Sequence, residues 1–94
     1  MTKIAIETTY SAFGTTVIDL PEGKTWADVA HYYIKWGRLH INFKGTPKDD
    51  YQEFQLDDVA MESDNYKRPD QTMIWSVAAD GEPDYDAEAL AKQE

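Results

Sequence analysis

Short runs in which apolar and polar side chains alternate are the feature that most limits how this chain can fold. The clearest run covers residues 38–44, with Leu39, Ile41 and Phe43 on one side and His40, Asn42 and Lys44 on the other. Alternation with a period of two is typical of a β-strand that has one covered face and one solvated face. The sequence therefore predicts an antiparallel sheet in which Asn42 points outward.

Further segments have the composition of strands, and turn residues separate them. They are Lys3–Tyr10, Thr15–Leu20, Tyr51–Leu56 and Gln71–Ala78. Residues 11–14 supply turn chemistry between the first two, which predicts an N-terminal hairpin. In the third, Phe54 and Leu56 are expected to point inward. Residues 57–65 fit either a short helical turn or an acidic loop.

The segment from Thr25 to Gly37 has the spacing of an amphipathic helix. Its apolar residues fall at i, i+3, i+4, i+7 and i+8, namely Trp26, Val29, Ala30, Tyr33 and Ile34. Thr25 is suited to be the N-cap, with Asp28 in the first turn, where a carboxylate is favourable. Gly37 stands where a left-handed C-terminal cap is needed. These signals predict one helix of about three turns.

Together the segments predict an α+β domain in the order ββαββ(α)β. An amphipathic helix buries its apolar stripe only against another element. We therefore expect an antiparallel sheet of four to five strands with the one amphipathic helix packed on one face. The 94 residues suffice for one domain. It is expected over residues 1–79, followed by an acidic C-terminal segment, 80–94, that is either ordered or flexible.

The chain has a net charge of −9, and its negative charge is concentrated in the second half. Residues 1–48 carry four acidic and six basic side chains, a net of +2. Residues 49–94 carry fourteen acidic and three basic side chains, a net of −11. The negative charge of residues 49–94 repels nucleic acid and anionic membranes, so neither is expected to bind directly. It favours a basic protein or a nucleoprotein complex as the partner.

The strongest charge pattern is an acid at every second position, at Asp80, Glu82, Asp84, Asp86 and Glu88. In an extended backbone such side chains project to one side about 6.6–6.8 Å apart, roughly half the charge density of one DNA strand. Acids available for a second row are Asp49, Asp50, Asp57, Asp58, Glu62 and Asp64. The pattern predicts a partner-binding surface that imitates nucleic acid. A flexible, solubilising tail is the alternative.

Two aromatic residues, Tyr32 and Trp36, lie four positions apart at the edge of the predicted helix. They either add an aromatic anchor to the partner-binding surface or pack against the flank of the sheet. The two histidines, His31 and His40, are expected at the surface, although His31 beside Asp28 leaves room for a metal or acid–base site. The chain has no cysteine, no zinc-protease or nucleophile motif and no glycine-rich phosphate loop, so no cofactor or metal is expected.

These observations predict a small acidic inhibitor that is not an enzyme and docks on a basic, nucleic-acid-binding surface of a larger partner. In size, charge and lack of motifs the chain resembles the small acidic inhibitors that phages direct against host CRISPR or restriction machinery. The N-terminus has no signal-peptide pattern, so the cytoplasm is expected, that of the host if the source is a phage. A monomer or a homodimer is expected. The alternatives are a structural or accessory phage or bacterial subunit, and a small metal-dependent enzyme that uses His31 and Asp28.

Overall fold

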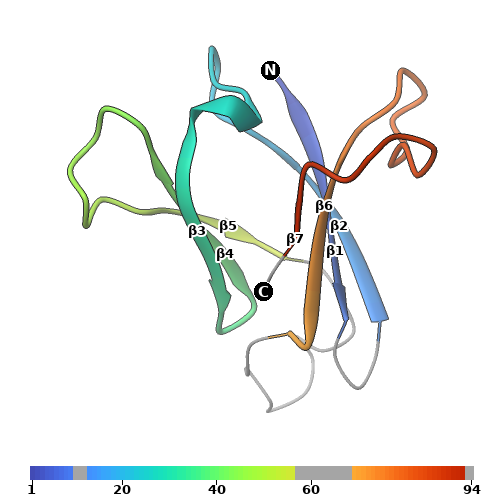
Figure 1. The fold of residues 1–94 in the computed structure, drawn as a ribbon, viewed down its shortest axis with the longest axis horizontal. Coiled ribbons are helices and arrows are strands. Elements are labelled where there is room, and N and C mark those ends of the chain that lie inside the picture. The colour runs from blue at the N-terminus through green and yellow to red at the C-terminus, as the bar shows by residue number, and fades with distance from the viewer. Residues whose placement is uncertain (10–12, 57–68, 93–94) are drawn as a thin grey trace.

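Two antiparallel sheets make up the computed structural model, which describes residues 1–9, 13–56 and 69–92 (Figure 1). The first has the strand order β2-β1-β6-β7, with bounds Phe13–Asp19, Lys3–Thr9, Gln71–Ser76 and Ala91–Lys92. The second has the order β3-β4-β5, with bounds Val29–Lys35, Arg38–Phe43 and Gln52–Gln55. The predicted α+β fold is therefore wrong, because the described residues form a mainly β structure with no α-helix.

The N-terminal hairpin is confirmed, and so are the predicted strands that became β4, β5 and β6. In the hairpin, Ile6 of β1 lies opposite Thr16 of β2. On its other side, Ile6 lies opposite Ile74 of β6. β1 is thus an inner strand between β2 and β6, which are far apart in the sequence, and these two neighbours fix which of its side chains face the core.

The predicted helix over residues 25–37 is absent. Residues Trp26–Asp28 form a single 3-10 turn, and the chain then enters strand β3. Val29–Lys35 is rich in β-branched and aromatic residues, which suit a strand paired with β4. A register shift between Val29 and His31 breaks strict alternation, so the apolar positions took on a helix-like spacing. Among the described residues, no helix is long and apolar enough to cross a membrane.

The residues that were expected to cap the helix adopt the expected local geometry, but they belong to a 3-10 turn and to a hairpin turn. The backbone N–H of Thr25 donates to Oδ2 of Asp28 at 2.8 Å, which closes the 3-10 turn. Gly37 is left-handed, with φ 71°, beside Trp36 with φ 61°. These two residues form the tight turn between the paired Lys35 and Arg38. A left-handed glycine is needed equally by a helix C-cap and by such a hairpin turn.

The apolar core lies between the inner faces of the two sheets. Its buried members in the first sheet and just after β2 are Ile4, Ile6, Ile18, Leu20 and Ile74, and those in the second sheet and just after β5 are Ile34, Leu39, Ile41, Phe43 and Leu56. The inward positions predicted for β4 are thus confirmed. Leu56 is also fully buried, whereas Phe54 is half-buried and packs against the edge of the core. The core gives both sheets a rigid inner face and leaves their outer faces for binding.

The prediction that Asn42 of β4 points outward is wrong, because its side chain is buried. Its Nδ2 donates to the carbonyl oxygens of Pro47 and Asp50 at 2.9 and 3.0 Å, and to Oγ1 of Thr46 at 3.2 Å. The loop between β4 and β5 is therefore folded around the amide of Asn42. A polar side chain that satisfies a loop can occupy a buried position at no loss of hydrogen bonds, which alternation alone does not reveal.

Candidate functional site

The acidic segment after β6 folds back along that strand. A β-bridge joins Val77 to Pro83, and the N–H of Asp84 donates to the carbonyl of Ser76 at 3.0 Å. Farther along, the N–H of Leu90 donates to the carbonyl of Ile74 at 2.6 Å. In Figure 1 the segment is the orange-to-red chain that leaves the upper end of β6 and returns beside it as β7. These backbone hydrogen bonds place the acidic side chains at one edge of the first sheet.

Two turns replace the extended row that the alternation of acids suggested. At the first, Gly81 has φ 88°, and Oδ1 of Asp80 accepts the backbone N–H of Glu82 at 3.0 Å. At the second, the N–H of Ala87 donates to the carbonyl of Asp84 at 3.2 Å. The acidic residues therefore lie on two successive turns and do not follow the regular spacing of a nucleic-acid backbone.

The carboxylates of this segment are available to a partner. Asp80, Glu82, Asp86 and Glu88 are exposed and Asp84 is half-buried. Within the described residues none of the five forms an ion pair with a basic side chain. We call these five residues, together with Tyr85, the acidic surface.

Tyr85 is the aromatic residue of the acidic surface. It is 53% exposed, and its ring meets Trp75 of β6 edge-on, with centroids 5.5 Å apart. Asp84 and Asp86 flank it in the sequence. An exposed aromatic ring that is held by a second ring and flanked in the sequence by acids has the composition of a protein-interface anchor. The predicted partner-binding residues omitted Tyr85, although its position between two acids was a usable signal.

The other predicted acids are not assembled with the acidic surface. Asp49 and Asp50 are exposed on the β4–β5 loop. In Figure 1 this loop projects on the opposite side of the molecule from the acidic segment. Asp57, Asp58, Glu62 and Asp64 lie outside the described residues. The structure therefore gives no second row of acids formed by Asp49 and Asp50 beside residues 80–88.

Tyr32 and Trp36 do not form one aromatic edge, because they belong to a strand and a turn. Tyr32 packs against the core and meets Trp26 edge-on, with centroids 5.4 Å apart. Trp36 is 61% exposed at the tip of the β3–β4 hairpin. Lys35 places its ammonium 5.8 Å from the centroid of the indole ring. Trp36 is therefore exposed, whereas Tyr32 is half-buried.

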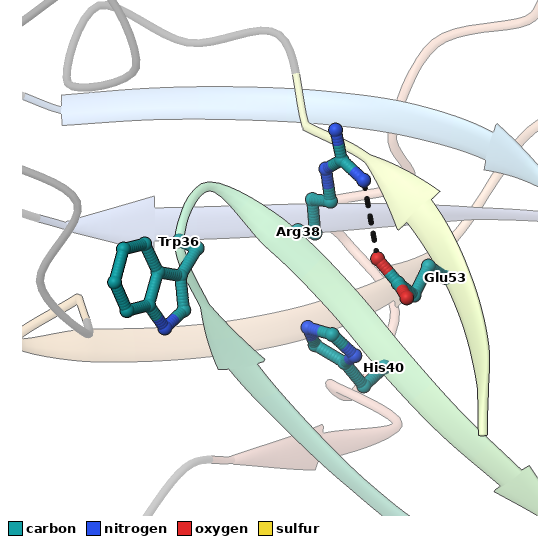
Figure 2. A pocket seen from close by; sticks show the side chains of 4 residues that line it. All are labelled: Trp36, Arg38, His40 and Glu53. Atoms are coloured by element: carbon teal, nitrogen blue, oxygen red, sulfur yellow. Dashed lines mark hydrogen bonds and ion pairs between the residues drawn. The ribbon is translucent and has the colours of Figure 1, made fainter. Parts of the chain in front are cut away.

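A shallow pocket opens beside Trp36 on the outer face of the second sheet (Figure 2). It has a volume of about 440 Å³ and is lined by Trp36, Arg38, His40 and Glu53. Nη1 of Arg38 donates to Oε1 of Glu53 at 3.2 Å, and the His40 ring stacks on Tyr33 at 4.4 Å between centroids. We call these four residues the tryptophan pocket. Glu53 joins it because β5 pairs with β4, with Glu53 opposite His40.

The histidines give no metal site of the kind considered from the sequence. His31 is exposed on β3, and the carboxylate of Asp28 accepts hydrogen bonds from Thr25. The pocket is lined by His40, with neither His31 nor Asp28. Throughout the described ranges, no group of three histidine, aspartate or glutamate side chains is arranged to hold a metal ion.

The pKa of Asp28 lies below the usual aspartate range. The main cause is the backbone N–H of Thr25, which stabilises the ionised carboxylate, and partial desolvation opposes it. Because the bond belongs to the 3-10 turn that precedes β3, this shift reports on local structure and lies apart from both candidate surfaces.

Comparison with protein families, curated proteins and solved structures gives no match for this chain.

Proposed function

We propose that this protein is a binding protein without enzymatic activity, whose acidic surface docks on a basic surface of a larger partner. One observation carries the proposal: exposed Tyr85 rests on Trp75 in a segment with five carboxylates that no basic side chain of the described residues neutralises. Buried on docking, the ring supplies apolar contact. The carboxylates attract a basic partner over a distance and determine its orientation.

The sharpest form of the proposal is an inhibitor that occupies a groove where the partner holds nucleic acid. The five carboxylates of the acidic surface support it, because a groove built for a polyanion is basic. Recognition in this form uses the carboxylates of the acidic surface together with its aromatic ring. Such a partner places the protein in the cytoplasm, and a monomer is sufficient for the contact.

Paired variants with equal charge changes test where the contact lies. Asp84→Asn/Asp86→Asn removes two charges beside Tyr85, and Asp49→Asn/Asp50→Asn removes two charges on the distant loop. Proteins captured on the immobilised wild-type domain and released by salt supply the partner for kinetic measurements. Both variants should lower the association rate somewhat, since long-range attraction depends on total charge. Only the Asp84/Asp86 variant should raise the dissociation rate, by about tenfold or more.

Equal dissociation rates for the two variants would remove the acidic surface from the mechanism. A Tyr85→Ala variant provides a test that leaves charge unchanged, and it should also raise the dissociation rate. Duplex DNA added to the complex should release the protein if it occupies a nucleic-acid groove. Captured partners that bind DNA and the domain at the same time would contradict the inhibitor form of the proposal.

A further inference from the structure

We propose that the tryptophan pocket is a second binding site, and that its ligand is an uncharged saccharide. The pocket lies on the outer face of the β3-β4-β5 sheet, whereas the acidic surface borders β6 of the other sheet. The inference is therefore independent of the proposed docking on a basic partner.

The first observation that supports a binding site is the backbone conformation of the turn that carries Trp36. A two-residue hairpin turn with two left-handed residues strongly favours Asn-Gly, because a β-carbon is poorly tolerated there. Trp36 nevertheless occupies the first of these positions with φ 61°, and its indole is 61% exposed. A bulky aromatic side chain is an unusual choice for this turn, because it is held in an unfavourable backbone conformation and exposes most of its surface to solvent. Such outliers concentrate at ligand-binding sites.

The second observation is the pair of polar groups in the pocket, Arg38 and Glu53, which indicates the kind of ligand. Arg38 has five N–H donors, and one of the two on Nη1 donates to Glu53 at 3.2 Å. Both side chains are about half exposed, at 54% and 50%. A guanidinium and a carboxylate side by side offer donors and acceptors at nearly zero net charge. A sugar hydroxyl is both donor and acceptor, so adjacent hydroxyls are matched to such a pair.

The flat indole beside this pair completes the match. The axial C–H groups of a pyranose ring form an apolar face that packs on an aromatic ring, while its hydroxyls point outward to polar groups. Figure 2 shows Trp36 on one side of the pocket with Arg38, Glu53 and His40 on the other. The volume of about 440 Å³ lies in the range of small-ligand sites. Lys35 above the indole is an exposed, weak cation–π contact that a sugar ring can replace.

Charged ligands are disfavoured at the same place. An anion such as a nucleotide phosphate is repelled by the carboxylate of Glu53 and by the net charge of −9 on the chain. A cation meets Arg38 and Lys35. The strand pairing of β3, β4 and β5 and the stacking of His40 on Tyr33 hold the pocket walls in place before binding, which reduces the entropy lost when a ligand is fixed.

Titration of the ¹⁵N-labelled full chain with neutral oligosaccharides tests the proposal. The probes are oligomers of glucose, N-acetylglucosamine, mannose and galactose, and the readout is the chemical shift of the Trp36 indole N–H and of neighbouring β4 and β5 amides. At least one oligomer should give a saturable shift. Trp36→Asn should weaken that binding at least about tenfold, while Trp36→Phe retains part of it. Arg38→Gln should weaken it as well.

The controls separate binding from folding. Asn is the favoured residue of this turn, so Trp36→Asn keeps the hairpin and removes only the indole. The Val17→Thr variant changes an exposed position on β2 of the other sheet, and it should bind as the wild type does. The proposal is overturned if no oligomer gives a saturable shift, or if Trp36→Asn binds unchanged. It is also overturned if oligothymidylate shifts the Trp36 signals and the neutral sugars do not.

Discussion

At the scale of single residues, Trp36 combines an unfavourable backbone conformation with an exposed side chain. A left-handed conformation costs an L-residue with a β-carbon roughly 1 kcal/mol, and Trp36 at φ 61° is the non-glycine residue of the described chain that adopts it. Asn tolerates this region because its short polar side chain bonds locally. The residue is therefore a place where local stability and a binding surface make opposing demands.

This conflict predicts a difference between two variants that both lose the indole. Trp36→Asn should have a free energy of unfolding about 0.5–1 kcal/mol higher than Trp36→Ala, because only the former relieves the turn. Urea denaturation followed by far-UV circular dichroism measures both. Equal stabilities would mean that the turn stores no such strain.

Asp28 predicts a dependence of stability on pH. The hydrogen bond from Thr25 lowers its pKa in the folded protein, so the folded state binds this proton more weakly than the unfolded state. Its contribution is present above the unfolded pKa, about 3.9, and is lost as the pH falls through the lower folded value. The stability difference between wild type and Asp28→Asn should therefore shrink between pH 6 and pH 3. A difference that is constant over this range would contradict the assignment.

At the scale of elements, residues 25–37 show why the fold class was predicted wrongly. The spacing of Trp26, Val29 and Tyr33 fits a helix, yet a strand with one register shift produces the same spacing. The composition of Val29–Lys35 favoured a strand, and pairing with β4 decided between the two. A Trp-Gly pair between two such runs was the available sign of a hairpin turn. Strict alternation, as in β4, was a sufficient signal for a strand.

The loop between β4 and β5 predicts a local loss of stability on changing Asn42. Asn42→Ala removes the donors to Pro47 and Asp50 and should cost about 1–3 kcal/mol. Asn42→Asp is nearly the same size, but it turns a carboxylate toward two carbonyl oxygens, so it should cost more than the alanine variant at neutral pH. Thermal unfolding gives the order of the variants. The reverse order would show that Nδ2 does not hold the loop.

The candidate site was predictable in part, and the limit is again long-range pairing. The acids of residues 80–88 stood out by alternation. Their position beside β6 depends on hydrogen bonds from the segment to that strand, such as that between Asp84 and Ser76. In the tryptophan pocket, Arg38 and His40 are close to Trp36 in sequence, but Glu53 arrives only through the pairing of β4 with β5. Contacts of this kind leave no periodic trace in one sequence.

At the scale of the whole molecule, two sheets depend on one core of about ten large side chains. A domain of this size has a total stability of roughly 5–15 kcal/mol. Ile6→Ala, at a fully buried position opposite Ile74, should cost about 2–5 kcal/mol and lower the urea midpoint strongly. Val17→Ala on neighbouring β2, 40% exposed, should cost less than about 1 kcal/mol. Similar costs for the two would contradict the assignment of the sheet faces.

The position of β1 between β2 and β6 has a consequence for biosynthesis. A ribosome releases the N-terminal strands first, and β6 begins only at residue 71. Until then the backbone edge of β1 that will receive β6 stays open, and an open edge pairs readily with other extended chains. Slow translation of the codons for residues 57–76 therefore lengthens the period in which the nascent protein is vulnerable to aggregation. Codon choice over residues 57–76 should affect the yield of folded protein more than the same change over residues 1–20.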